Sequence, residues 1–491
     1  MVDKLYSDTA HLLRRAGFGA APELISASTS LGLERLTDNL LNPERTADGI
    51  DDTEMVRKLT NLVPPDKNGS TPIVVVKMWW TYRMLTSPNL LQEKMTLFWH
   101  GHFTSKLGND GDAMLAQNQT FRQMGLGNFR TLTMAISRDP AMLRYLNGNQ
   151  NYKAHPNENY ARELMELFTC GIGNYTEDDV KAAARAFSGW NLRGDAFAFN
   201  PRQHDNGQKT FMGKTGNWNG DDIVDMLVAS PATAKRLCTQ LFTYFGYDDP
   251  EPEVVSALVK TYFASGYDIR QVVGTILRST AFYSDRARNA VIKSPVQYVI
   301  GSVNVLGLQD AFKVAMSQIT PQNDMPDPTT TAKNPGRAFA QNQATAGLVV
   351  LVNAMRSMGQ DILAPPNVKG WDGSEHWINS TTLLARTNFS NRLVKLRMVR
   401  RQAATFAELQ AATTTPQLAS DVVDQLAIRL GPLNLSPATR TSLINYLGAT
   451  QNETKRNHSR PNEDGAHTQY VNQTELNLLG LMMSSSEFQV C

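Results

Sequence analysis

The stretch "HPNENYARELMELFTCGIG" (155–173) combines three glutamates, an arginine and a histidine with regularly spaced apolar residues. Pro156 is typical of a helix start and Gly171 of a helix end, so the stretch predicts a helix over 157–170. Four apolar residues recur at helical spacing and predict one buried face: Tyr160, Leu164, Leu167 and Phe168. The charged residues flank that face. This helix therefore has little plain solvent-facing surface.

The carboxylates of this helix support two interpretations. At about 100° per residue, Glu163 and Glu166 share one flank, whereas Glu158 and Arg162 share the other. Two carboxylates in one cleft drive their pKa values apart, as acid–base catalysis and glycoside hydrolysis require. The candidate catalytic residues here are Glu158, Arg162, Glu163 and Glu166. Alternatively, Arg162 lies four residues from both Glu158 and Glu166, and an ordinary ion-pair ladder explains those two.

The motif "FWHGHF" (98–103) places His100 and His102 two residues apart. Two such imidazoles can bind one divalent transition metal, such as zinc, copper, iron or nickel, and Glu163 or Glu166 can supply a carboxylate ligand. We therefore treat His100 and His102 as candidate metal ligands. The alternative is that both histidines hydrogen-bond to carboxylates and cap helices.

Further candidate residues lie in Gly- and Asn-rich loops. Indole rings beside polar loops suit a saccharide, because the apolar sugar face stacks on the ring while the hydroxyls find hydrogen-bond partners. The candidate substrate-binding residues are Trp190, Trp218, Lys369, Trp371 and Asp372. In the same loops, His204 and Asp205 are candidate catalytic groups. The alternative is that each tryptophan anchors its loop to the helical core.

Six stretches stand out in order along the chain: "AHLLRRAGFG" (10–19), "EKMTLFWHGHF" (93–103), "NENYARELMELFTCGIGNYTEDDV" (157–180), "AFSGW" (186–190), "KSPVQYVIG" (293–301) and "PPNVKGWDG" (365–373). Together they resemble the bacterial domain-of-unknown-function family numbered 1800, over nearly the whole chain. The resemblance implies a helical fold. Many members are exported or encoded beside a sulfatase-like protein, so it also implies an extracytoplasmic location and a sulfatase-like partner.

Composition narrows the class of protein. The 491 residues carry a net charge of +2, which produces no general field for nucleic acid or an anionic membrane. We expect a soluble chain, because no apolar run reaches the length of a membrane span and no export signal opens the sequence. Three distant cysteines exclude a disulfide scaffold: Cys170, Cys238 and Cys491.

The predicted fold is mainly α, a multi-helix globular fold with one small β-hairpin and a long irregular loop. Apolar periodicity predicts helices along most of the chain, among them 22–42 and 89–100. The hairpin pairs "FAFN" (197–200) with "KTFMG" (209–213), and the loop spans 318–343. We predict a single helical unit over 1–491, with its core in 1–317 and 344–491.

The function that these patterns favour is that of a hydrolase acting on a saccharide-containing or cell-envelope polymer, metal-dependent if the histidines bind a metal. The alternative is a non-catalytic binding or assembly protein in which the histidines, glutamates and arginines form a buried structural network.

Overall fold

The computed structural model describes residues 3–63, 69–319, 343–395, 419–457 and 476–491. Helix makes up 64% of the structure, and the described strands form two small sheets. The mainly helical fold is therefore confirmed. The predicted irregular loop at 318–343 lies almost entirely outside the described residues.

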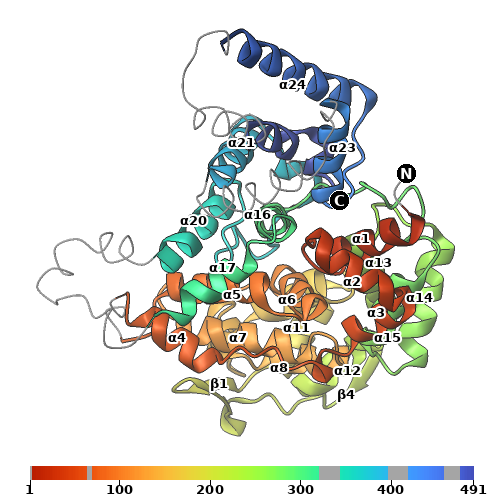
Figure 1. Ribbon diagram of the computed structural model, residues 1–491. Coiled ribbons are helices and arrows are strands. Elements are labelled where there is room, and N and C mark those ends of the chain that lie inside the picture. The colour runs from red at the N-terminus through yellow and green to blue at the C-terminus, as the bar shows by residue number, and fades with distance from the viewer. Residues whose placement is uncertain (1–2, 64–68, 320–342, 396–418, 458–475) are drawn as a thin grey trace, which may run out of the picture.

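The elements follow one another in a nearly continuous series of helices (Figure 1). Up to residue 150 they are α1 (Lys4–Arg15), α2 (Pro22–Leu31), α3 (Leu33–Leu41), η1 (Pro43–Arg45), α4 (Asp52–Thr60), α5 (Ile73–Thr86), α6 (Leu90–His102), α7 (Gly111–Met124), α8 (Phe129–Ser137), α9 (Pro140–Tyr145) and η2 (Gly148–Gln150). The middle of the chain forms α10 (Glu158–Glu163), η3 (Leu164–Phe168), α11 (Glu177–Ala186), β1 (Trp190–Arg193), β2 (Ala196–Phe199), η4 (Pro201–Gln203), β3 (Lys209–Phe211), β4 (Lys214–Gly216), α12 (Gly220–Val228), α13 (Pro231–Phe245), α14 (Pro252–Ala264) and α15 (Ile269–Arg278).

The remaining elements belong to the last two fifths of the chain. They are α16 (Pro295–Val305), α17 (Gln309–Ser317), α20 (Gln343–Ser357), η5 (Ser374–Trp377), α21 (Ser380–Val394), α23 (Ala419–Arg429), α24 (Pro437–Asn457) and α26 (Ser486–Gln489). Residues 476–484 are also helical.

Two helix boundaries differ from the expectations. The helix expected over 22–42 is broken into α2 and α3 at Gly32, whose φ of 78° lies in a region that side chains rarely adopt. The helix expected over 89–100 continues to His102, so Gly101 does not end it. The whole "FWHGH" segment is consequently helical.

The predicted pairing of the two strand segments is wrong. The segment 197–200 overlaps β2, which pairs with the preceding strand β1. The segment 209–213 contains β3 and the turn after it, and β3 pairs with the following strand β4. Both Met212 (φ 46°) and Gly213 (φ 74°) have positive φ, as a type I′ turn requires. Tight local turns close at less entropic cost than the longer connection, and they decide the pairing.

Apolar side chains gather in two cores. The first draws on α1, α3, α6 and the helices from α8 to α15, and the second on α4, α5, α16, α17, α20, α21, α23 and α24. Figure 1 shows α20, α21, α23 and α24 above the body that holds the first core. Helix α6 lies between the cores, because Met95 and Trp99 belong to the first and Leu97 to the second.

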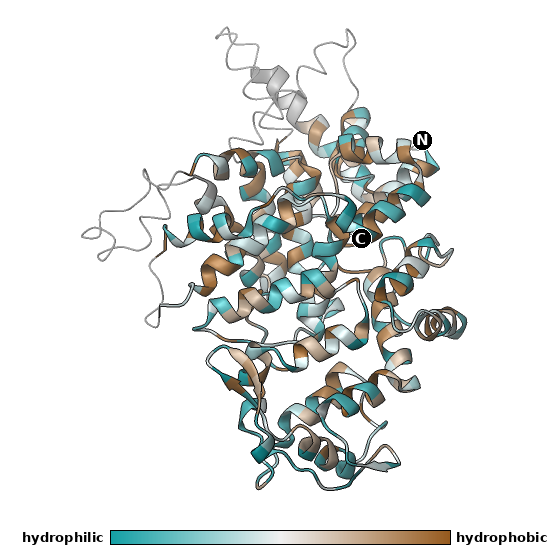
Figure 2. Ribbon diagram, turned by 90° about the horizontal axis from the view of Figure 1, so that it is seen from below, coloured by the Kyte–Doolittle hydropathy of each residue, from teal (hydrophilic) through white to brown (hydrophobic). Residues whose placement is uncertain are grey.

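Hydrophilic and hydrophobic residues alternate along the helices, as Figure 2 shows. Among the described residues, none of the helices combines the length and the apolar character needed to cross a membrane.

Candidate functional site

The helix expected over 157–170 changes its winding part-way. Residues 158–163 form the α-helix α10, whereas 164–168 form the π-helical turn η3. Two carbonyl groups of this turn bind side chains from other helices: His102 Nε2 donates to Phe168 O at 3.0 Å, and Arg236 donates to Leu167 O at 2.5 Å. Such turns are rare and frequently occur at functional sites.

The glutamates of this segment fall into two groups. Arg162 binds Glu158 at 3.1 Å and also Glu177 of α11, at 2.7 Å through both of its terminal nitrogens. Of the predicted ion-pair ladder, the half with Glu158 is therefore present, and Glu177 stands in place of Glu166. These three residues form a half-exposed ion-pair cluster.

The second group is the pair Glu163 and Glu166. Glu166 accepts a hydrogen bond from the Tyr175 hydroxyl at 2.9 Å, whereas Glu163 has no hydrogen bond or ion pair to any of the described residues. Burial raises the pKa of Glu163, and the charge of Glu166 raises it further against the opposing effect of Arg162. The structure thus brings together two carboxylates with different environments.

The two histidines of α6 point in different directions. Residues two apart on a helix differ by about 200° around its axis. His100 packs against Trp80 and accepts a hydrogen bond from the Leu363 N–H at 3.0 Å, whereas His102 lies beside Phe103 and binds Phe168 O. The two imidazoles therefore face opposite sides of α6 and do not line one common site.

Both imidazoles are held neutral. Burial lowers the pKa of His100 to about 3, with a further contribution from Lys77. Burial likewise lowers the pKa of His102 to about 3, helped by Arg236. Within the described ranges, no group of three or more His, Cys, Asp or Glu side chains is placed to hold a metal ion. Metal binding at either histidine stays a prediction.

The polar groups of the 204–209 loop bind one another and the backbone. His204 Nδ1 donates to Ser188 O at 2.8 Å. Arg185 binds Asp205 at 2.6 Å and lowers the pKa of that carboxyl to about 2. The Lys209 ammonium donates to the carbonyls of Asp205 and Gly207. The arrangement holds the loop closed on itself.

The tryptophans lie in separate places. Trp190 is buried against Phe187 and Phe197, with Arg138 over its ring, and Trp218 donates to its own loop at Lys214 O. Trp371 lies 5.6 Å from His100 between ring centroids. Lys369 and Asp372 beside it form an exposed ion pair of 2.8 Å. The structure thus places Trp371, Lys369 and Asp372 together, but not with Trp190 or Trp218.

The loop that holds Trp371 packs on the end of α6. A Cβ atom at Gly370 would approach Gly101 O to 3.0 Å, and Gly370 has a φ of 86°, so only glycine fits without strain. Thr104 also donates to Val368 O. Gly370 of "PPNVKGWDG" therefore allows its loop to approach the backbone at the end of α6.

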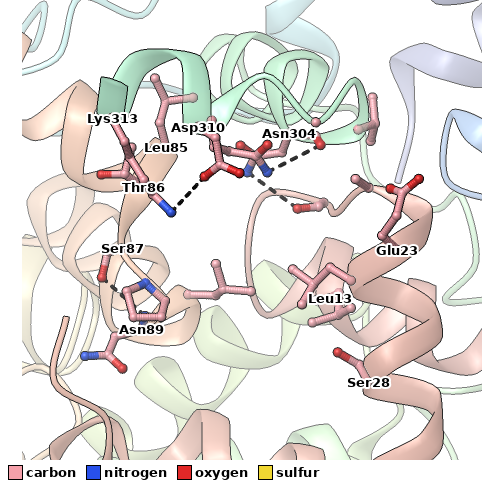
Figure 3. Close-up of a pocket in the computed structure, with 18 of the residues that line it drawn as sticks. Leu13, Glu23, Ser28, Leu85, Thr86, Ser87, Asn89, Asn304, Asp310 and Lys313 are labelled. Atoms are coloured by element: carbon pink, nitrogen blue, oxygen red, sulfur yellow. Dashed lines mark hydrogen bonds and ion pairs between the residues drawn. The ribbon is translucent and has the colours of Figure 1, made fainter. Parts of the chain in front are cut away.

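A cleft of about 850 Å³ opens elsewhere, between α1–α3 on one side and the α16–α17 corner on the other. Figure 3 shows Asn304, Asp310 and Lys313 along one side of this space. Leu13 and Ser28 lie on the other side. Since the walls come from both hydrophobic cores, the cleft lies at the boundary between them. None of the site residues predicted from the sequence lines it.

The charged residues of the cleft are already paired. Lys313 binds Asp310 at 3.1 Å, and Arg429 reaches Glu23 at 3.8 Å across the mouth. Asp48 forms an ion pair with Arg83 of α5. The cleft therefore presents no uncompensated charge among these groups.

One buried polar atom next to the cleft has no hydrogen-bond partner. Asn304 is 2% exposed, and its Nδ2 donates to Gly19 O at 3.5 Å, the limit of a hydrogen bond. Its Oδ1 has no hydrogen-bond partner among the described residues. A buried acceptor without a partner is costly. This oxygen is itself buried, so it does not open onto the space of the cleft.

A family model described as "Protein of unknown function (DUF1800)" matches residues 11–490. The chain belongs to this family. The resemblance carried by the six sequence stretches is thereby confirmed. No curated protein and no solved structure matches the chain.

In this DUF1800 chain, one of the six stretches also builds the cleft. The segment 10–19 contributes Leu13 and Gly19 to its lining, and α16, which begins within 293–301, carries Asn304 in its last turn. The remaining lining residues are mostly leucines and small polar residues without a motif. Three lining glycines, Gly19, Gly49 and Gly307, have positive φ values of 93°, 68° and 65° and carry local signals of irregular turns at this place.

Proposed function

We propose that this DUF1800 protein is a binding protein whose ligand occupies the cleft between the two cores. The observation that carries the proposal is the cleft itself, which leucine side chains and polar groups line together. Ligand sites are typically concave, largely apolar, and about 300–1,000 Å³ in volume, with a few fixed polar groups. They also favour the boundary between packed units, where this cleft lies.

The buried charged groups around α6 support a structural role for the histidines, glutamates and arginines that stand out in the sequence. Glu93 is buried and binds both Arg83 and Arg122, at 2.9 and 2.7 Å. Burial alone would raise the pKa of Glu93, but the two arginines together lower it. With the backbone bonds of His100 and His102, these pairs form a buried polar network in which Glu93 and both histidines have partners. Such a network supports the class of a non-catalytic binding or assembly protein.

The test blocks the cleft with a bulky side chain. Leu24 lines the cleft and Ala27 does not, although both are exposed on α2. We expect Leu24→Trp to abolish binding of small-molecule fragments that saturation-transfer NMR detects on the wild-type protein, and Ala27→Trp to retain it. A fragment set that yields no binder sensitive to Leu24→Trp would contradict the proposal.

A second candidate function is hydrolysis of a saccharide-containing or cell-envelope polymer, with Glu163 as acid and Glu166 as its partner. The observation that favours it is the raised pKa of Glu163 beside a second carboxylate at a π-helical turn. Release of soluble sugar from purified bacterial cell walls, lost in Glu163→Gln and retained in Glu158→Gln, would support it. A sulfatase-like partner and an extracytoplasmic location stay predictions of the family resemblance.

A further inference from the structure

The lining of the cleft is mixed in character. Leucine, isoleucine and valine side chains stand beside serine, threonine, asparagine and glutamine side chains. Among the described residues of the lining, Tyr82 is the one aromatic side chain. Saccharides are typically held on aromatic rings, and a plain alkyl chain would displace water from the polar groups without replacing its hydrogen bonds. The lining therefore suits a ligand that carries apolar and polar groups along its whole length.

One edge of the cleft is a backbone segment with unused hydrogen-bonding groups. Residues 46–50 follow η1, and Asp48 and Gly49 of this segment line the cleft. The backbone N–H and C=O groups of Ala47, Asp48 and Gly49 form no hydrogen bond to any residue that the structure describes. Ala47 and Gly49 are exposed, so these groups are reachable from solvent. Three consecutive residues can thus bind the backbone of a ligand.

Side-chain amides add further donors and acceptors along the cleft. Asn39 of α3 is exposed, and its amide has no hydrogen bond within the described ranges. Asn89 donates through Nδ2 to Thr46 O at 3.1 Å, which leaves Oδ1 open to a ligand. Figure 3 shows Asn89 on one side of the space and Ser28 on the other. A primary amide donates and accepts hydrogen bonds as a peptide group does, so it is a natural partner of a peptide backbone.

The charge pattern of the lining favours uncharged ligand side chains. The three acidic groups of the lining each have a basic partner: Asp310 with Lys313, Glu23 with Arg429, and Asp48 with Arg83. An incoming charge would lose hydration without gaining a free counter-charge.

We propose that the cleft binds an extended peptide segment of a partner protein, in which aliphatic side chains alternate with uncharged polar or small ones. The peptide backbone exchanges hydrogen bonds with residues 47–49 and with the Asn39 amide, and the aliphatic side chains lie against the leucines of the lining. In peptide recognition of this kind, main-chain hydrogen bonds supply affinity and pockets for alternate side chains supply specificity. This inference rests on the proposed binding function, and it adds the chemical class of the ligand.

The test is titration calorimetry on the full chain with four acetylated and amidated hexapeptides. Leucine alternates in them with serine, alanine, asparagine or glutamine. Maltohexaose and octan-1-ol represent a saccharide and an alkyl ligand. We expect at least one peptide to bind about tenfold more tightly than either comparison compound, because only a peptide can use both kinds of lining group.

Two N-methylated forms of the tightest peptide test the backbone contacts. Alternate N–H groups of an extended chain point to the same edge, so one form carries methyl groups on the three leucine nitrogens and the other on the remaining three. At least one form should lose about tenfold in affinity, because its methyl groups block the hydrogen bonds to the cleft. Parent-like affinity of both forms would overturn the inference.

A protein variant tests the side-chain amide. Asn39→Leu keeps the approximate shape and removes the donors and the acceptor, so the peptide should bind about tenfold more weakly. A ligand held by apolar contacts alone would bind Asn39→Leu more tightly. Arg35→Leu is the matched control: Arg35 is exposed on the same helix and does not line the cleft, so the affinity should be unchanged.

The outcomes separate the inference from the function beneath it. Tighter binding of maltohexaose or octan-1-ol than of every peptide would overturn the inference, as would unchanged or tighter peptide binding by Asn39→Leu. If Leu24→Trp abolished the binding of that comparison compound, the proposed binding function would stand. Absence of binding by the whole series would overturn the inference as well, and the fragment experiment on Leu24→Trp would then decide the proposed function separately.

Discussion

Two equally buried asparagines show how the region around α10 and α11 differs from the cleft. Asn151 and Asn304 are each 2% exposed. Asn151 donates to Ala184 O at 2.8 Å and accepts from Asn157 N at 3.0 Å, so both ends of its amide are used. Asn304 has one hydrogen bond at the distance limit and a free acceptor. Both ends of the first amide are used within the fold, whereas the second amide leaves a buried acceptor without a partner.

The same contrast extends to the charged and aromatic groups. Around α6, α10 and α11, most polar side chains bind each other or the backbone, and we call this the closed region. Glu163, Lys94 Nζ and Arg122 Nη1 are exceptions without a hydrogen bond among the described residues. In the cleft, polar groups line an open space. A sequence pattern dense in histidine, glutamate and tryptophan therefore marks intensive packing as readily as it marks chemistry.

The largest expected effect is in the closed region. Glu93→Gln leaves two buried arginines with less compensation, so we expect the free energy of unfolding to fall by about 3–5 kcal/mol. Urea unfolding at pH 7 measures it. Glu158→Gln is the control, because its half-exposed ion pair with Arg162 should cost less than about 1 kcal/mol. A small effect of Glu93→Gln would remove the distinction between the two regions.

The closed region should also make the protein sensitive to acid. The folded pKa of His100, about 3, lies below its unfolded value of about 6.5, so the unfolded chain binds the proton first as pH falls. The stabilisation is complete above pH 6.5 and is lost towards pH 3. Between pH 6.5 and 4.5 we expect a loss of roughly 2–3 kcal/mol from His100.

Urea unfolding at several pH values measures this loss. Gln at position 100 can accept the Leu363 N–H but does not titrate, so His100→Gln should flatten the pH dependence by that amount. An unchanged slope in the variant would mean that His100 becomes protonated in the folded protein.

The two asparagines sharpen the comparison directly. Asn151→Leu leaves the Ala184 carbonyl and the Asn157 N–H without these hydrogen bonds. The free energy of unfolding should therefore fall by about 2 kcal/mol. Asn304→Leu removes one weak bond and an unsatisfied acceptor, so it should cost less than about 1 kcal/mol. Chemical denaturation of the two variants in parallel gives the difference. Equal losses would show that the Asn304 amide is structural as well.

The smallest expected effect is that of Glu163→Gln. The raised pKa of Glu163 means that its charge opposes folding at neutral pH, so the neutral variant should melt at the same or a slightly higher temperature at pH 8. The gain should disappear as the pH falls and Glu163 itself becomes protonated. Differential scanning fluorimetry measures both. A clear loss of stability would reveal a buried partner of this carboxylate.

Sequence patterns predicted the parts of the fold that depend on residues close together in the chain. Apolar periodicity and capping residues indicate the helices well, because both act within a few residues. The π-helical turn was not predictable, since its carbonyls are bound by His102 and Arg236 from distant segments. The predicted strand pairing was wrong because two-residue turns close at less entropic cost than the longer connection that it required.

The site was harder to predict than the fold. Whether His100 and His102 converge depends on whether α6 ends at Gly101, and in the structure it continues to His102. The cleft joins residues from Leu13 to Arg429, and no local pattern relates them. A buried acceptor without a partner is visible only after the chain has folded.

The most direct test of the central claim is a crystal structure of the full chain soaked with a fragment whose binding Leu24→Trp abolishes. Our account predicts electron density for that fragment in the cleft, against the leucine side chains that line it. The closed region around His100, His102 and Glu163 should be unchanged. Density beside Glu163 and Glu166, with an empty cleft, would contradict it.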